Sequence, residues 1–316
     1  MPAVSDGRQL GSALRYAFPW ADVAAIAREA EALGFRGLFL PESGGRDALV
    51  TLGALAGETH TLGLGTGVLP MGSRTDVITA MGAATVQERS DARLVLGLGT
   101  GPPAPGALDR LRRLVATVRR LLGGDTIEES GRRLRISLVP ASPPPIWISA
   151  LGPNAVRTAG AIADGVLLNW CTPERVLRAR AELTMGAEAA GRDPDDVTVA
   201  VYVRACMDAD ERSAVDTLRS AASEYASFPA YARQFGSLGL AAEAEAAAAA
   251  HAAGRPQDAP VALVRAVCLS GDVGAARLGL QAYREAGAHL PIVYPVATAA
   301  DPVASVLATL RALAPG

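Results

Sequence analysis

Lysine is absent from this sequence of 316 residues, so every strongly basic side chain is an arginine. Without a side-chain amine, the protein cannot form a lysine Schiff base with a carbonyl substrate or use lysine as a nucleophile. Arginine and the acidic residues nearly balance, which gives a formal net charge of −2. This balance argues against a dominant surface for nucleic acid or for an acidic membrane.

Cysteine and histidine are also scarce, with three residues of each. They are scattered along the chain, as Cys171, Cys206 and Cys268 and as His60, His251 and His289. No CxxC pair and no HxxxH spacing occurs, so the sequence predicts neither a disulfide framework nor a metal site. We interpret the cysteines as buried thiols, because a free cysteine behaves as a small apolar side chain.

Long apolar runs are missing as well. The nearest approach, over residues 241–250, is interrupted by Glu243 and Glu245, so no membrane-spanning helix is expected. The first residues, MPAVSDGRQLGSALRY, contain no apolar stretch of the length found in signal peptides. These absences predict a cytoplasmic protein without a membrane or nucleic-acid partner.

The sequence does contain a regular alternation of short apolar runs and amphipathic segments, and half of its residues are apolar. Residues 107–122, for example, place Leu111, Val115 and Val118 on one stripe at helical spacing. Strands are expected at 13–17, 35–42, 61–65, 93–98, 143–149, 165–168, 197–203 and 291–294. Helices are expected at 22–33, 46–58, 74–89, 107–122, 153–163, 174–190, most of 212–253, 272–286 and 301–313.

The expected strands are short and nearly uncharged, as parallel strands buried on both faces should be. Eight strand–helix alternations without a domain-boundary linker predict the α/β class and a single (β/α)8 TIM barrel over residues 1–316. A doubly wound sheet is the alternative architecture. We interpret a small hairpin near 124–140 and an alanine-rich helical segment near 210–254 as insertions into this barrel.

The hexapeptide LGLGTG occurs twice, at 62–67 and at 96–101, about one strand–helix unit apart. The dinucleotide-binding pattern GxGxxG requires a third glycine, but Val68 and Pro102 stand at those positions. At the carboxyl end of a barrel strand, glycine lets the backbone approach a flat ligand closely. The alternative is that these glycines only relieve crowding at the strand ends.

A third glycine site follows the strand expected at 143–149. Gly152 and Pro153 begin the next helix there, and proline suits the first helical position. The free backbone N–H groups of such a helix start can bind a phosphate without any basic side chain. Phosphate at one strand end, with close backbone contact at two others, predicts a planar phosphorylated cofactor across the barrel mouth.

These segments together resemble the luciferase-like monooxygenase superfamily, and within it the branch that uses the deazaflavin coenzyme F420. The resemblance covers nearly the whole chain, and the block at 145–170 is its most specific part. It is carried by ALGFRGLFLPE at 32–42, LGLGTGVLP at 62–70, ERSDARLVLGLGTG at 88–101, PIWISALGPNAVRTAGAIADGVLLNW at 145–170 and YREAGAHLPIVYP at 283–295.

The resemblance implies coenzyme F420 as the cofactor, with FMN as the alternative. It implies that the deazaflavin ring lies against a bulge with a non-proline cis peptide bond at Gly67–Val68. The phosphate group is implied to bind where the third glycine site begins its helix. The implied cofactor-binding residues are Gly65, Thr66, Gly67, Val68, Gly99, Thr100, Ala150, Leu151, Gly152, Pro153 and Asn154. Arg157, Arg175 and Arg178 are candidates for the anionic tail of the cofactor or, alternatively, for a solvated helix face.

The resemblance also implies catalytic positions, and this chain departs from the family at some of them. Glu42 and Ser43 stand where the family commonly has an acidic residue and a histidine, so a histidine acid or base is lost. Trp170 is expected to form a wall over the cofactor or, alternatively, only to pack. Arg204 and Tyr294 are further proton-donor candidates, and the alternative for Tyr294 is packing under the ring. Pro102 replaces a glutamate that is catalytic in some relatives, and the loop at 101–107 is short.

Three functions follow from this resemblance. The first is an F420-dependent oxidoreductase that transfers a hydride to or from a small organic substrate. The second is an FMN-dependent monooxygenase that works with molecular oxygen and a reductase partner. The third is a protein that holds a flavin or deazaflavin without turnover. The superfamily also implies a homodimer formed through helices of the barrel wall.

Overall fold

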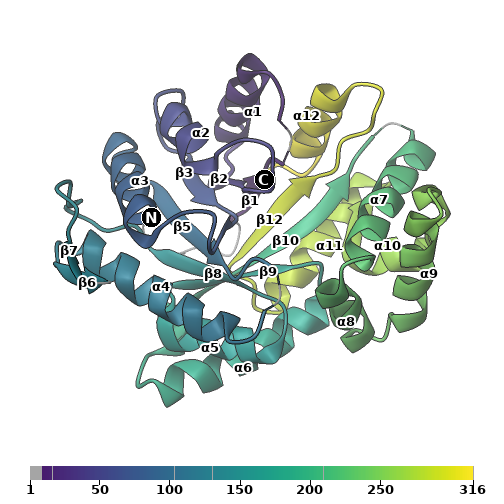
Figure 1. Cartoon of the computed structure of the whole chain (residues 1–316). Coiled ribbons are helices and arrows are strands. Elements are labelled where there is room, and N and C mark those ends of the chain that lie inside the picture. Colours follow the sequence, from purple (N-terminus) through teal and green to yellow (C-terminus); the bar gives the residue numbers. More distant parts are fainter. Residues whose placement is uncertain (1–8, 16, 103, 130, 209, 316) are drawn as a thin grey trace.

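Eight parallel strands close into a barrel in the computed structural model, which describes residues 9–315 except Tyr16, Pro103, Ser130 and Ala209 (Figure 1). Each strand pairs with its neighbours along the chain, and the last strand pairs with the first, which closes the ring. The barrel strands are β1 (Gly11–Ala13), β2 (Gly37–Leu40), β3 (Gly63–Thr66), β5 (Leu94–Gly99), β8 (Ile146–Ala150), β9 (Gly165–Asn169), β10 (Thr198–Cys206) and β12 (Leu290–Pro295). The predicted (β/α)8 barrel is therefore confirmed.

Eight helices surround these strands. They are α1 (Trp20–Ala32), α2 (Ala48–Leu55), α3 (Asp76–Arg89), α4 (Ala107–Leu122), α5 (Pro153–Ile162), α6 (Pro173–Ala189), α11 (Val273–Glu285) and α12 (Pro302–Ala312). Several begin at residues that suit a helix start: the side chains of Asp47, Thr172 and Asp301 each accept a hydrogen bond from a first-turn N–H. Within the described part of the chain, no helix has the length and hydropathy needed to cross a bilayer.

Side chains pack the barrel in two layers. Inside, Phe39 stacks on Trp147 with ring centroids 5.5 Å apart, and Tyr202 meets Tyr294 edge to face at 4.9 Å. Outside, the strands bury leucine and valine side chains such as Leu64 against the helices. Strands that are apolar on both faces fit only such a doubly covered sheet, which explains the nearly uncharged runs in the sequence.

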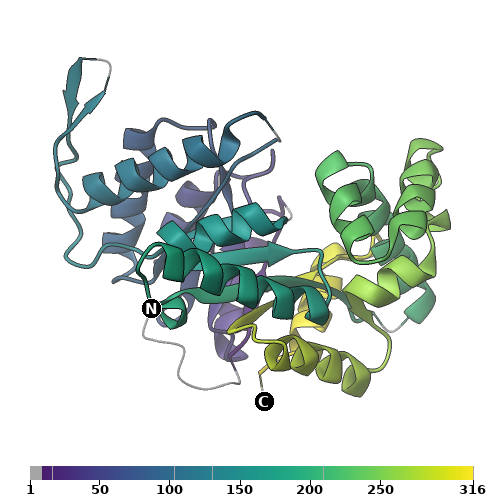
Figure 2. The same ribbon diagram turned by 90° about the horizontal axis from the view of Figure 1, so that it is seen from below.

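Two further groups of elements extend the barrel. The hairpin of β6 (Ile127–Glu129) and β7 (Arg132–Leu134) lies within the predicted 124–140 and projects away from the barrel (Figure 2). Between β10 and β12 in the sequence, a cluster of helices packs on one side of the barrel (Figure 1). Its members are α7 (Glu211–Ala226), α8 (Pro229–Ser237), α9 (Ala241–Ala252) and α10 (Val261–Val267). Two short strands at the rim, β4 (Leu69–Pro70) and β11 (Cys268–Ser270), pair with β5 and β10.

Two predictions about elements were wrong in detail. The first strand was expected at 13–17, but β1 spans Gly11–Ala13, where its pairing with β2 ends, and Arg15 beyond it forms an ion pair with Glu224. The segment after residue 254 was given no structure, although it contains α10 and β11. Both elements are too short, at seven and three residues, for a helical or strand period to stand out in the sequence.

Candidate cofactor site at the barrel mouth

The glycine-rich segments meet at neighbouring strand ends. Strand β3 pairs with β5, and β5 pairs with β8, so their carboxyl ends lie side by side at one rim of the barrel. Gly99 lies next to Ser149 of β8, since a Cβ atom added to Gly99 would stand 2.8 Å from the Ser149 Oγ. The fold thus brings together the ends of the strands that carry the predicted ring and phosphate contacts.

Close packing accounts directly for several of these glycines. A Cβ atom added to Gly65 would overlap the ring of Phe39, and one added to Gly67 would overlap the Tyr202 hydroxyl. At Gly99 the added atom would stand 2.6 Å from a methyl carbon of Val68. The crowding interpretation of the sequence therefore holds for all three positions, whether or not a ligand also touches them.

The segment after β3 has the backbone that the family resemblance implies. The Gly67–Val68 peptide bond is cis, and the Tyr202 hydroxyl donates a hydrogen bond to the Gly67 carbonyl at 3.0 Å. The Thr66 hydroxyl donates to the Gly97 carbonyl and accepts from the Gly97 N–H, both at 2.8 Å, and it is buried. Thr66 thus joins two strands, whereas the half-buried Val68 and Thr100 stand at the rim.

Helix α5 begins at the rim beside these strand ends. Gly152 is the exposed N-cap residue before the helix and offers no side-chain cap, and Pro153 is the first helical residue. An atom added at the Gly152 Cβ position would meet nothing within 4 Å. The start of α5, including Asn154, is therefore open to solvent and keeps the backbone geometry that binds phosphate groups.

A buried arginine contacts the residue that precedes this helix start. Arg175 of α6 is 5 % exposed, and its Nη2 donates to the Leu151 carbonyl at 3.0 Å and to Glu182 at 2.8 Å. Its other terminal nitrogen, Nη1, is buried and has no hydrogen-bond partner. A donor left unpaired at a helix start is an observation that fits a bound phosphate, because burying it without an acceptor costs free energy.

Backbone contact between α5 and α6 sets the position of this helix start. A Cβ atom added to Gly160 would overlap the Leu183 carbonyl oxygen, and one added to Gly186 would overlap the Arg157 carbonyl oxygen. The two helices can approach this closely only because both positions are glycine. The sequence therefore fixes where α5 begins relative to the buried Arg175 on α6.

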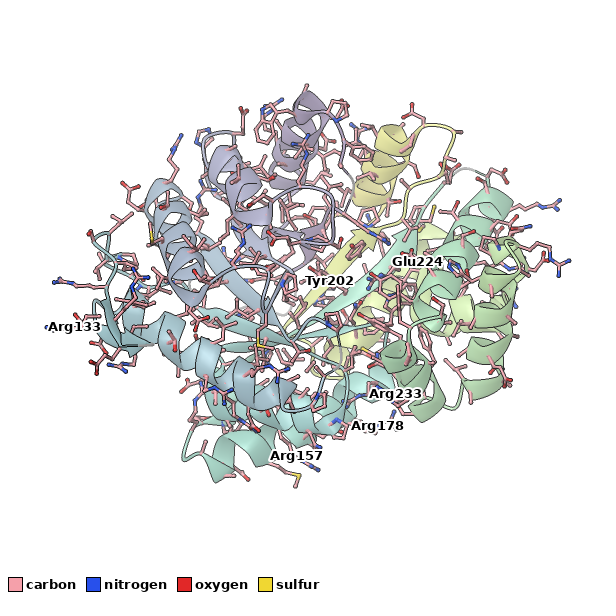
Figure 3. The ribbon with its side chains drawn as sticks, in the orientation of Figure 1. Arg133, Arg157, Arg178, Tyr202, Glu224 and Arg233 are labelled. Atoms are coloured by element: carbon pink, nitrogen blue, oxygen red, sulfur yellow. The ribbon has the colours of Figure 1, made fainter. Side chains whose placement is uncertain are left out.

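Figure 3 labels three exposed arginines in its lower part, namely Arg157, Arg178 and Arg233. The Arg157 guanidinium donates to the Asn154 amide oxygen at 3.4 Å, and Arg178 donates to the Ser237 carbonyl of α8 at 3.5 Å. These exposed cations come from α5, α6 and α8. Arg157 and Arg178 are exposed, as a solvated helix face requires, whereas the buried Arg175 does not fit that alternative. The predicted contact with the cofactor tail stays a prediction.

Glu42 occupies a different setting from the one expected of a proton donor. Its carboxylate forms an ion pair with Arg74 at 2.7 Å, and it also accepts from the Ala48 N–H at 3.2 Å. Arg74 binds Asp47, the residue before α2, in the same way. These contacts tie Glu42 to the start of α2, while Ser43 follows on an exposed loop. Their predicted catalytic roles stay predictions.

Trp170 and Arg204 lie at the centre of an aromatic cluster, which joins the barrel mouth to the helices α7 and α8. The Arg204 guanidinium carbon is 4.5 Å from the Trp170 ring centroid and 5.2 Å from that of Tyr225. Tyr231 accepts a hydrogen bond from the Asn169 amide at 2.8 Å. Tyr225 and Tyr231 were not among the residues predicted from the sequence, although four aromatic residues lie within 225–235 in a chain that is only 4 % aromatic.

The cysteines have the properties of buried thiols. Burial raises the pKa of Cys171 and of Cys268 to about 12, and that of Cys206 to about 11. All three are buried and free, so they remain protonated at neutral pH and are poor nucleophiles. Among the described residues, no group of His, Cys, Asp and Glu is arranged to bind a metal ion.

A separate cavity of about 340 Å³ lies at the opposite, amino-terminal end of the barrel. Its polar side chains are already paired: Gln87 bonds to the Ser142 carbonyl at 2.7 Å, and Arg119 forms an ion pair with Asp164 at 3.1 Å. A ligand site needs polar groups that are free to bind the ligand. The polar side chains just named are already bonded to other parts of the protein. We therefore place the candidate site at the carboxyl ends of the strands.

The closed barrel and its glycine-rich rim define an α/β-barrel protein whose candidate site lies at the carboxyl end of the sheet. The chain belongs to the luciferase-like monooxygenase family, because the model of that family matches residues 2–290.

Two curated relatives and one solved structure show what the chain is similar to. A 5,10-methylenetetrahydromethanopterin reductase from Methanolobus tindarius is 32% identical over 210 residues, which are 62% of this chain and 64% of the relative. An F420-dependent glucose-6-phosphate dehydrogenase from Microbacterium testaceum is 30% identical over 222 residues, 60% of this chain and 65% of the relative. Each match thus spans less than two thirds of the relative's own length.

The solved structure is an F420-dependent secondary alcohol dehydrogenase in complex with an F420–acetone adduct. Its TM-score is 0.79 at 18% sequence identity, and the match covers 97% of this chain and 99% of that one. At this identity the likeness concerns the fold.

Proposed function

We propose that the protein is an F420-dependent oxidoreductase, which transfers a hydride between the deazaflavin and a small organic substrate. The observation that carries this proposal is the open start of α5 above the unpaired, buried Nη1 of Arg175. It follows β8, which pairs with β5, and β5 pairs in turn with β3; these two strand ends present Gly99 and the cis peptide bond at the rim. The names of the relatives support F420 as the phosphate-bearing group that fits there.

In this proposal each part of the rim has a stated task. The first-turn backbone of α5, over Gly152 and Asn154, and the Arg175 guanidinium hold the phosphate. Val68 and Gly99, with Gly65, Gly67 and Thr100 around them, support the ring, and Ala150, Leu151 and Pro153 place the helix start. Thr66 contributes by fixing β3 to β5. Bound F420 supplies the hydride chemistry, and the protein orients the reactants and excludes water.

FMN also carries a phosphate, so the phosphate site alone does not choose between the two cofactors. The feature that favours F420 is the set of exposed arginines Arg157, Arg178 and Arg233 on α5, α6 and α8 (Figure 3), of which Arg157 bonds to Asn154 in the first turn of α5. F420 has an anionic tail beyond its phosphate, and guanidinium groups pair well with carboxylates. A monooxygenase using FMN would leave these arginines without that partner.

The proposal is tested by titrating the purified protein with F420 and with FMN, followed by fluorescence. F420 should bind at least tenfold more tightly than FMN. A lower dissociation constant for FMN would overturn the assignment of the cofactor. Oxidation of reduced F420 in the presence of a panel of enones and imines then tests turnover, and tight binding without any turnover would favour a non-catalytic carrier.

We also propose that the protein forms a homodimer through α2 and α3. These neighbouring helices expose Val50, Ile78 and Met81, of which Val50 is 71 % exposed. Apolar side chains gathered on adjacent helices are typical of an interface between subunits. Sedimentation equilibrium should give a dimer for the wild type and a monomer for Ile78→Glu, whereas Leu278→Glu on α11 should stay dimeric.

A further inference from the structure

Arg204 occupies an unusual environment at the mouth of the barrel. It is 3 % exposed, near the end of β10, and its guanidinium carbon lies 4.2 Å from the Tyr294 ring centroid and 4.5 Å from that of Trp170. The rings of Tyr202 and Tyr225 lie within 5.6 and 5.2 Å of the same atom. The guanidinium is therefore surrounded by π faces rather than by water.

The charge of Arg204 has no ionic partner in the described part of the chain. No carboxylate oxygen there lies within 4.0 Å of its guanidinium nitrogens, and its Nη1 donates a hydrogen bond to the neutral amide oxygen of Asn169. Two arginines nearby differ, since Arg15 pairs with Glu224 and Arg175 with Glu182. Burying a cation without an anion costs free energy, which the rings offset only in part.

Trp170 places a second unpaired donor in the same cluster. Its side chain is 1 % exposed, and its indole N–H is buried without an acceptor. Its backbone has a φ of 48°, a value that large residues rarely adopt, and Gln234 holds its carbonyl at 2.7 Å. A backbone conformation of this kind is retained where the surroundings require the side chain to point in one direction.

The position of Arg204 relates it to the proposed cofactor site. Tyr202 precedes it by two residues on β10, so both side chains lie on the face that points into the barrel. The Tyr202 hydroxyl bonds to the Gly67 carbonyl, next to the cis peptide bond. Arg204 therefore lies two residues nearer the mouth than Tyr202, which bonds to the segment predicted to support the cofactor ring.

We propose that Arg204 and the indole N–H of Trp170 bind a carboxylate group of the substrate. This inference rests on the proposed function, because it assigns the class of molecule that meets the cofactor: an organic acid. A guanidinium offers parallel N–H donors that match the two oxygens of a carboxylate, and the apolar rings favour a weakly hydrated planar anion. The aromatic walls around Arg204 also suit a conjugated or aromatic carbon skeleton.

The test is calorimetric titration of the full chain with benzoate, both alone and saturated with F420. The wild type should bind benzoate saturably, and Arg204→Met should weaken binding at least tenfold. Arg204→Lys, which keeps the charge but loses the planar donor pair, should fall between them. Trp170→Phe should weaken it several-fold. Arg119→Met, at the opposite end of the barrel, is the control and should bind benzoate as the wild type does.

F420 titration of the same variants separates the possible results. If Arg204→Met binds F420 within about threefold of the wild type, the variant is folded and its loss of benzoate binding supports the proposal. Equal benzoate binding by the wild type and Arg204→Met would overturn it. A selective loss of affinity for reduced F420 in that variant would also overturn it, because Arg204 would then serve the cofactor. Failure of the wild type to bind F420 would instead refute the proposed function, whatever the benzoate result.

Discussion

At the residue scale, the two copies of LGLGTG show how one hexapeptide serves two kinds of packing. In the first copy, Gly65 and Gly67 leave room for the side chains of Phe39 and Tyr202 inside the barrel. In the second copy, Gly99 leaves room for Val68 and for Ser149 of the neighbouring strand. Glycine is required in each case because any side chain would occupy space that a neighbour already fills.

Gly99→Ala should therefore damage both stability and cofactor binding. The added methyl would push against Val68 and Ser149, which stand at 2.6 and 2.8 Å. Overpacking of this kind costs about 1–3 kcal/mol in the free energy of unfolding. Urea denaturation would measure that loss, and F420 titration should show at least tenfold weaker binding.

Gly236→Ala is the matched control for Gly99→Ala. Gly236 lies inside α8, and the nearest atom to its added Cβ is 3.9 Å away. Alanine there should raise the free energy of unfolding by about 0.5–1 kcal/mol and leave F420 binding unchanged. If Gly99→Ala behaved like this control, the contacts of Gly99 would not constrain the rim.

Glu42→Gln separates an anchoring role from a catalytic one. The substitution leaves Arg74 with Asp47 as its remaining carboxylate partner and should lower the free energy of unfolding by about 1 kcal/mol. The rate of hydride transfer should fall less than tenfold, because the Glu42 contacts are directed to α2. Stopped-flow oxidation of reduced F420 measures this rate. A thousandfold lower rate with an unchanged free energy of unfolding would indicate that Glu42 acts as the acid or base.

At the element scale, the sequence predicted most helices and strands to within about two residues, because apolar periodicity and start residues agree. Helix α4 matches its prediction at both ends. Helix α10 and strand β11 could not be predicted, since they are stabilised by packing against α7 and β10 rather than by a pattern of their own. Tertiary contacts decide the structure of such short segments.

The phosphate part of the site was predictable, whereas the aromatic cluster was not. Gly152 and Pro153 are adjacent in the sequence and together indicate the start of a helix. The cluster combines β9, β10, β12, α7 and α8, so Arg204 and Tyr225 meet only through the fold. Pairings over such long separations in sequence leave no local trace, apart from the unusual density of aromatic residues in 225–235.

Gly186→Ala tests whether the contact between α5 and α6 positions the helix start. The new methyl would overlap the Arg157 carbonyl, so the helices must separate. We expect the free energy of unfolding to fall by about 1–3 kcal/mol. F420 binding should weaken in parallel, because the start of α5 moves away from Arg175. Retained F420 affinity despite lower stability would contradict this role of the helix pair.

At the scale of the whole molecule, polar contacts fasten the helical cluster α7–α10 to the barrel mouth. Arg15, just after β1, forms a two-pronged ion pair with Glu224 of α7, at 2.9 and 3.3 Å (Figure 3 labels Glu224). Gln234 of α8 donates to the Trp170 carbonyl at 2.7 Å. These contacts hold the cluster against the strand ends of β1 and β9.

His289 links the stability of the whole molecule to pH. Burial, aided by Arg180, lowers the pKa of His289 in the folded state, and its Nδ1 accepts the Val199 N–H at 2.9 Å. The unfolded chain, with a pKa of about 6.5, takes up a proton first as the pH falls. The contribution of His289 to the free energy of unfolding is therefore fully present above about pH 6.5. It is lost as the pH falls from there to the lowered pKa of the folded state.

This decline should appear as a drop in melting temperature between about pH 7.5 and 5.5. His289→Asn keeps an acceptor for the Val199 N–H but does not titrate, so its melting temperature should vary less over that range. His251→Asn, at an exposed position on α9, should show the same pH dependence as the wild type. An unchanged slope in His289→Asn would contradict the assignment to His289.

The central claim is that the start of α5 binds the phosphate of F420, and the pair Gly152→Asp and Gly152→Asn tests it most directly. Aspartate and asparagine are both favoured at the N-cap of a helix, and the space around Gly152 is open. Both variants should therefore fold, with a free energy of unfolding at or above that of the wild type. Asparagine is neutral, but the aspartate carboxylate repels a phosphate. Both side chains compete alike for the first-turn N–H groups, so F420 titration should give a dissociation constant at least tenfold higher for Gly152→Asp than for Gly152→Asn. Equal F420 affinity in the two variants would contradict the account.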